Sequence, residues 1–104
     1  MERVAFKMKL KPGYEQEYKK RHDAIWPALV NILKESGIED YSIFLDETTL
    51  DLVGVMKISD PGNLDELPAR QVMQEWWHYM SDIMETNADH SPQTISLKEV
   101  FYLQ

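Results

Sequence analysis

The sequence contains no cysteine, which excludes disulfides, thiolate metal sites and a cysteine nucleophile. Its four glycines are isolated from one another, so no glycine-rich loop is available to bind a phosphate. Positive charge is also scarce, because 11 basic residues face 18 acidic ones, for a net charge of −7. Since nucleic acids are bound through clustered positive charge, we expect no nucleic-acid partner.

Long hydrophobic runs are absent as well. The first 15 residues alternate charged with apolar side chains and therefore predict neither a signal peptide nor a membrane-spanning helix. We expect no membrane association and a cytoplasmic location. The chain has 104 residues, 43% of them hydrophobic, which is enough for one domain with a modest core, and we assign that domain to residues 1–104.

Hydrophobic periodicity predicts the element order β-α-β-β-α-β. The expected strands are 1–10, 38–46, 52–58 and 94–104, and the expected helices run from the break at 11–15 to about 34 and from about 69 to 84. Pro68 predicts an interruption just before the second helix. This order is typical of an α+β, ferredoxin-like fold, in which an antiparallel sheet carries both helices on one face.

The second face of this sheet is predicted to be apolar at its centre. By strand parity it carries Ala5, Phe44, Val53, Val55, Val100 and Tyr102, among the charged residues Arg3, Lys7, Lys9 and Lys57. An apolar surface of this kind is rarely left in water on a monomer. We therefore predict a twofold homodimer in which two copies cover each other, the alternative being a monomer with an amphipathic outer face.

His22 lies in the first predicted helix, on its apolar side. On an uninterrupted helix, one stripe within about 40° of Tyr18 contains His22, Ile25, Leu29 and Ile32. Tyr41 has the buried parity of its strand and Trp26 flanks the stripe, so both can line a polar and aromatic cavity with His22. Its imidazole is then either a core residue with a hydrogen-bond partner or a proton carrier with a pKa of about 6.5 before any perturbation.

Two adjacent tryptophans occur in "EWWHYM", residues 75–80. On the second helix Met73, Trp77, Met80 and Met84 share a stripe, and Trp76 lies about 100° from Trp77. We predict that Trp77 faces the interior and that Trp76 lies at its rim. An indole ring can pack against the C–H face of a sugar while its N–H binds a hydroxyl, although plain core packing explains the same pattern equally well.

Of the other two histidines, His78 is predicted to have no role, and for His90 only a contribution to a lid stays open. His78 lies opposite the apolar stripe, where it is solvated, and His90 lies in the loop over 85–93. No HxxxH or HxH spacing occurs, so we predict no metal site.

Several segments together resemble the L-rhamnose mutarotase family. They are "RH..IWP" at 21–27, "YSIFLD" at 41–46, "WW.YM.DIM" at 76–84, "N.D.SP" at 87–92 and "EVFYL" at 99–103, and they extend almost from end to end. The resemblance implies a dimeric α+β barrel that interconverts the anomers of L-rhamnose without a cofactor. It also implies that His22 is the proton donor and that Tyr18, Tyr41, Trp76 and Trp77 contact the sugar. The chain departs from the family pattern at Ala24, Ala28 and His90.

The chemistry of anomer interconversion agrees with such a site. A catalyst must protonate the ring oxygen while a base removes the proton of the anomeric hydroxyl, and no redox step or metal is required. We assign His22 as the general acid, and the base stays open among Tyr18, Tyr41, a carboxylate and a water. The alternative functions are a cofactor-free monooxygenase of the same barrel class and a non-catalytic sugar-binding protein.

Overall fold

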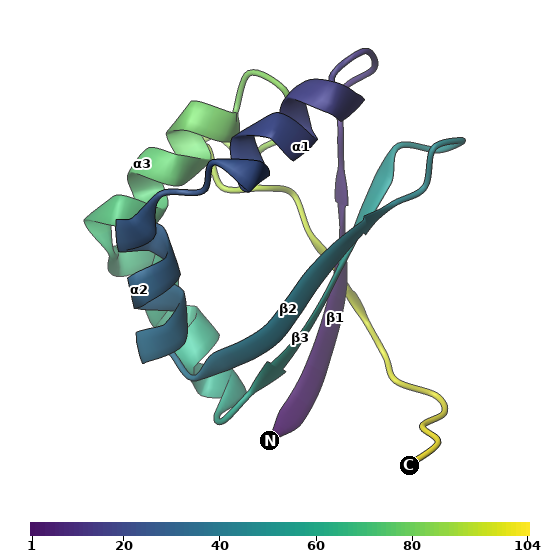
Figure 1. Cartoon of the computed structure of the whole chain (residues 1–104), viewed down its shortest axis with the longest axis vertical. Coiled ribbons are helices and arrows are strands. Elements are labelled where there is room, and N and C mark those ends of the chain that lie inside the picture. The colour runs from purple at the N-terminus through teal and green to yellow at the C-terminus, as the bar shows by residue number, and fades with distance from the viewer.

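A computed structural model describes residues 1–104 as one antiparallel sheet with helices on one of its faces (Figure 1). The strands are β1 (Glu2–Lys9), β2 (Ile38–Leu45), β3 (Asp51–Ile58) and β4 (Ile95–Leu97). The helices are α1 (Glu15–Asp23), α2 (Pro27–Glu35), the 3-10 helix η1 (Pro61–Ala69) and α3 (Gln71–Met80). The spatial order β2-β3-β1-β4, with every neighbouring pair antiparallel, confirms the predicted ferredoxin-like fold.

The prediction of a single long helix that ends near residue 34 is wrong, because two helices occupy this segment. Helix α1 ends at Asp23, and Trp26 is extended (φ −64°, ψ 130°) immediately before Pro27, the first residue of α2. Proline disfavours helical backbone at the preceding residue and provides no N–H for a helical hydrogen bond. The break turns the chain so that α1 and α2 follow different directions (Figure 1).

The second helix and the last strand are shorter than predicted. Helix α3 ends at Met80, and Met84 stays buried through a bridge with Leu10 rather than through a helical turn. Strand β4 covers three residues, so the expected strand over 98–104 is not formed. Beyond β4 the chain contacts β1 through side chains, because Arg3 donates hydrogen bonds to Glu99 and its guanidinium lies over the ring of Tyr102.

The inner face of the sheet forms the core with the helices, as 15 buried hydrophobic residues in one cluster. Two backbone features of the sheet shape this face. A bulge between Glu39 and Ser42 adds one residue to β2, with Asp40 at φ +50°, so that both Ile38 and Tyr41 pack inward. Gly54 lies under the ring of Phe6, where a Cβ atom would come within 2.5 Å of the ring, and Phe6 contacts Tyr41 edge-on at 6.2 Å.

The outer face has the composition that strand parity predicted for β1, β2 and β3. The prediction is wrong for the last strand, because Val100 and Tyr102 lie beyond β4 and outside the sheet. The register pairs Phe44 with Val53 and Ala5 with Val55, so these four side chains share one face. The register also adds Leu97 and Ile95 to this face, opposite Ala5 and Lys7.

Among the helices, none combines the length and the apolar character that crossing a membrane requires.

Candidate active site

Five aromatic side chains gather where α1 meets the C-terminal half of α3. This aromatic cluster consists of Tyr18, His22, Trp26, Trp76 and Tyr79. The imidazole of His22 stacks on the ring of Tyr18, with centroids 4.3 Å apart, and meets the indole of Trp76 edge-on at 5.3 Å. Trp26 packs edge-on against Trp76 at 5.0 Å and stacks on Tyr79 at 5.5 Å. The helix break before Pro27 therefore places Trp26 against α3.

One nitrogen of His22 is held by the backbone. Its Nδ1 lies 3.0 Å from the carbonyl oxygen of Tyr18, one helical turn earlier. A carbonyl only accepts, so Nδ1 carries a proton and donates it, which sets the tautomer of the ring. The Nε2 atom makes no hydrogen bond within the protein and is therefore the nitrogen that can exchange a proton with a ligand.

Burial sets the charge of this imidazole. It lowers the pKa of His22 below 6.5, and the hydrogen bond to Tyr18 and the nearby charge of Asp23 oppose that shift only in part. At neutral pH the ring is therefore mainly uncharged, with a lone pair on Nε2. His22 therefore has features of both alternatives. It is half-buried with one nitrogen hydrogen-bonded, as a core residue would be, and its other nitrogen is free, as a proton carrier requires.

Two phenol hydroxyls accompany this imidazole. Burial raises the pKa of both Tyr18 and Tyr41, and the proximity of Tyr41 adds to the shift of Tyr18. No fully buried side-chain nitrogen or oxygen of the chain lacks a hydrogen-bond partner. Neither hydroxyl is hydrogen-bonded to a protein group, so neither oxygen is fully buried and each is accessible to a water-sized molecule. Both remain neutral donors that can bind a ligand hydroxyl.

Arg21 links α1 to the chain segment at the end of α3, on the outside of the aromatic cluster. Its side chain is 11% exposed and donates to the Asp82 carboxylate at 2.9 Å and to the Tyr79 carbonyl at 2.7 Å. The hydrogen bonds from Arg21 lower the pKa of Asp82, so the carboxylate stays ionised. Since Arg21 and His22 are neighbours on α1, this ion pair fixes the position of the imidazole relative to α3.

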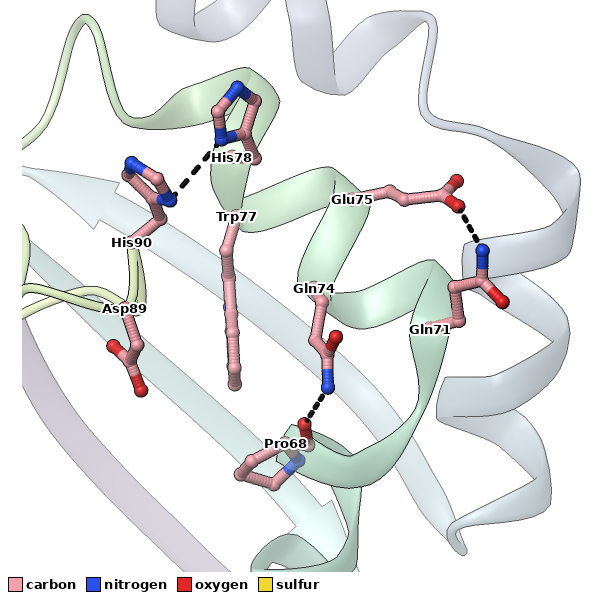
Figure 2. Close-up of a pocket in the computed structure, with 8 residues that line it drawn as sticks. All are labelled: Pro68, Gln71, Gln74, Glu75, Trp77, His78, Asp89 and His90. Carbon is pink, nitrogen blue, oxygen red and sulfur yellow. Dashed lines mark hydrogen bonds between the residues drawn. The ribbon is translucent and has the colours of Figure 1, made fainter.

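The predicted orientation of the two tryptophans is wrong. Trp76 is the buried one, at 5% exposure, and shares its face of α3 with Met73 and Met80. Trp77 is half-buried and lines a separate open groove of about 540 Å³, where its ring extends between Pro68 and Asp89 (Figure 2). The prediction used Met84 to define the apolar stripe of this helix, but Met84 lies beyond the end of α3. The predicted stripe therefore contained Trp77 in place of Trp76. Of the five predicted site residues, Tyr18, His22, Trp76 and Tyr41 converge and Trp77 faces this groove.

The same groove brings together the other two histidines of the chain. His78 on α3 and His90 in the following loop approach with their Nδ1 atoms 3.2 Å apart (Figure 2). Their separation of 12 residues follows no common metal-ligand spacing, so only the loop geometry reveals the pair. No group of three or more metal-binding side chains converges anywhere in the chain.

Comparisons with known proteins agree on one family. A family model described as L-rhamnose mutarotase matches residues 3–103. A protein of Sinorhizobium fredii named L-rhamnose mutarotase is 55% identical over 103 residues, which is 99% of each chain. One of Flavobacterium johnsoniae with the same name is 59% identical over 101 residues, covering 97% of this chain and 94% of its own.

Solved structures add a full-length match. The crystal structure of the L-rhamnose mutarotase of Formosa agariphila superposes with a TM-score of 0.93 at 46% identity, with all of both chains covered. An antibiotic biosynthesis monooxygenase reaches a TM-score of 0.50 at 14% identity, covering 94% of this chain and 97% of its own. The second likeness concerns the fold alone, so it does not favour the monooxygenase alternative.

Proposed function

Because this chain belongs to the L-rhamnose mutarotase family and has the activity of an L-rhamnose mutarotase, we propose that its aromatic cluster is where the sugar anomers interconvert. The observation that supports this site best is the state of His22. It has one nitrogen fixed by a backbone carbonyl and the other free. An imidazole of this kind exchanges protons at a defined atom without reorienting.

His22 begins the cycle as the proton acceptor. Its lowered pKa leaves Nε2 unprotonated at neutral pH, so it takes the proton of the anomeric hydroxyl. The C1–O5 bond breaks with its electron pair moving to the ring oxygen, which is protonated by a phenol or by water. The product is the open-chain aldehyde.

Ring closure uses the same groups in reverse. After rotation about the C1–C2 bond, the O5 hydroxyl returns its proton to the phenol or water and attacks the other face of C1. The imidazolium of His22 then protonates the new anomeric oxygen. The sequence assigned His22 as the general acid of ring opening, and the present proposal reverses that assignment because the lowered pKa leaves Nε2 unprotonated. His22 acts as an acid only in the closing step, and every proton is restored at the end of the cycle.

The phenols of Tyr18 and Tyr41 bind the sugar, and one of them or a water protonates its ring oxygen. Both stay protonated, because burial raises their pKa values, and both hydroxyls lack a partner within the protein. The Trp76 indole, edge-on to His22, forms the apolar wall of the site. For Trp77 the sugar contact rests on the family resemblance alone, because its half-buried ring lines the separate groove and not the aromatic cluster.

His22→Ala tests this assignment. The variant should lose about 10²- to 10⁴-fold of the enzymatic rate, the range typical of a general acid–base group. NMR saturation transfer between the anomeric protons of L-rhamnose measures the exchange at equilibrium. Lys20→Ala is the matched control, because Lys20 is exposed on the same helix. Full exchange in a folded His22→Ala variant would return His22 to a packing role.

The wild-type protein separates the remaining alternatives in the same assay. A non-catalytic sugar-binding protein would shift the sugar resonances without speeding the exchange between anomers. A cofactor-free monooxygenase would consume oxygen with an aromatic substrate and leave the exchange at its spontaneous rate. We expect faster anomer exchange and no oxygen uptake.

The protein acts as a homodimer in which a second copy covers the outer sheet face. Phe44 on β2 and Ile95 on β4, the two edge strands of that face, are 63% and 62% exposed. The chain beyond β4 adds Val100, Phe101 and Leu103, each at least 78% exposed, and runs past the end of the sheet farthest from α1 (Figure 1). Apolar area that continues from a sheet face into an arm is more than a soluble monomer usually exposes. A second copy with the same two features covers both.

Light scattering after size exclusion tests the dimer. The wild type should have twice the chain mass of 12.2 kDa. Phe44→Asp should yield monomers, because it places a charge in the apolar contact, whereas Ala28→Asp on the exposed side of α2 should not. A monomeric wild type, or a dimer that tolerates Phe44→Asp, would contradict the proposed interface. A cytoplasmic location remains a prediction.

A further inference from the structure

The loop after α3 presents one histidine to another across the groove beside Trp77. His90 has a left-handed backbone (φ +69°) and donates its N–H to the carbonyl of Asn87 at 3.0 Å. Asn87 in turn donates its N–H to the carbonyl of Ser91 at 2.8 Å, and the Ser91 N–H donates to the Asp89 carboxylate at 3.0 Å. These bonds shape the loop independently of the His78 contact, so the position of His90 is set before the two rings meet.

The geometry of the two rings suits a shared metal ion. Their planes are nearly perpendicular (87°), and their Nδ1 atoms lie 3.2 Å apart. Two imidazole nitrogens bound to one tetrahedral Zn²⁺ at about 2.0–2.1 Å are separated by about 3.3 Å. Both side chains are exposed, so the small rotations that direct both lone pairs to one point are unhindered. Figure 2 shows the two Nδ1 atoms facing each other across the top of the groove.

The surrounding charge favours a cation. The Asp89 carboxylate, next to His90, accepts a hydrogen bond from the Ser91 N–H at 3.0 Å. Asp89 and Glu75 line the same groove, and the chain carries a net charge of −7. Neither carboxylate joins the histidines in a cluster of three protein ligands. Water therefore completes the coordination of any ion held here.

We propose that His78 and His90 form a two-histidine site for a divalent transition-metal ion such as Zn²⁺ or Ni²⁺, which links the 85–93 loop to α3. Imidazole donors select ions of this class over Mg²⁺ and Ca²⁺, which prefer oxygen ligands. The site lies outside the aromatic cluster and is independent of the proposed catalytic role of His22.

Calorimetric titration of tag-free protein with ZnCl₂ at pH 7.5 tests the site. The wild type should bind about one ion per chain, and MgCl₂ should give no signal. Outer-shell changes alone weaken metal binding by roughly 10- to 100-fold, so His78→Gln and His90→Asn should each cost at least as much. His22→Gln is the matched control and should retain the wild-type affinity, because it leaves the pair intact.

A second readout distinguishes loss of the site from loss of the fold. Both histidines are exposed, so the metal-free variants should melt at the wild-type temperature, and only the wild type and His22→Gln should gain stability with Zn²⁺. Equal Zn²⁺ affinity in wild type and both variants would overturn the proposal. An absence of saturable binding in the wild type would also overturn it and leave the pair as a hydrogen bond between the two imidazoles.

Discussion

Replacing each of the two adjacent tryptophans by phenylalanine should reveal which one supports the fold. Trp76 is 5% exposed between His22 and Trp26, whereas Trp77 is half-buried at the groove. A buried tryptophan removes about 150–250 Å² from water, and phenylalanine gives up roughly a quarter of that area. At about 25 cal/mol per Å², the transfer loss at Trp76 is about 1.2 kcal/mol. The cavity and a weakened aromatic contact add about as much again.

The expected cost of Trp76→Phe is therefore about 2–3 kcal/mol, a decrease in Tm of about 10–20 °C for a domain of this size. Trp77→Phe should cost less than about 1 kcal/mol, because water in the groove fills the vacated space. Urea and thermal unfolding at equal protein concentration measure both values, since dimerisation makes Tm depend on concentration. Equal losses, or a larger loss at Trp77, would refute the burial described above and restore the order that helical periodicity predicted.

Three further changes address the sheet, the ion pair and the imidazole. Gly54→Ala should destabilise the fold by about 1–3 kcal/mol in urea unfolding, because its Cβ would come within 2.5 Å of the Phe6 ring; an unchanged midpoint would show that the ring moves freely. Arg21→Lys should cost about 1–2 kcal/mol in the same assay, because one ammonium cannot reproduce the guanidinium bonds to Asp82 and the backbone; a loss below roughly 0.5 kcal/mol would mean that solvent replaces them. The enzymatic kcat/KM, corrected for spontaneous exchange, should fall as the pH drops through the pKa of His22, which lies below its ordinary value of about 6.5. It should stay level from about pH 6.5 to 8, because His22 is already unprotonated there. A kcat/KM that decreases as the pH rises over that range would mean that His22 starts the cycle protonated.

The sequence by itself determined the element order and most of the sheet. Alternation with a period of two depends only on neighbouring residues, so β1 and the apolar outer residues Ala5, Phe44 and Val53 were predictable. The apolar side of α1 was predictable because helical periodicity also depends only on residues close in sequence. This periodicity placed Tyr18 and His22 toward the interior. The resemblance of several longer segments to one family then indicated the chemistry.

Other features depended on contacts between distant residues, which periodicity does not contain. The break before Pro27 was visible in the sequence, but only packing shows that it brings Trp26 onto Trp76. The order of burial of Trp76 and Trp77 depended on where α3 ends, and a bridge between Met84 and Leu10 decided that end. The tautomer of His22 and its lowered pKa required a particular carbonyl and a particular degree of burial. The pairing of His78 with His90 required a loop whose own hydrogen bonds return it to the helix, and only the tertiary structure contains that information.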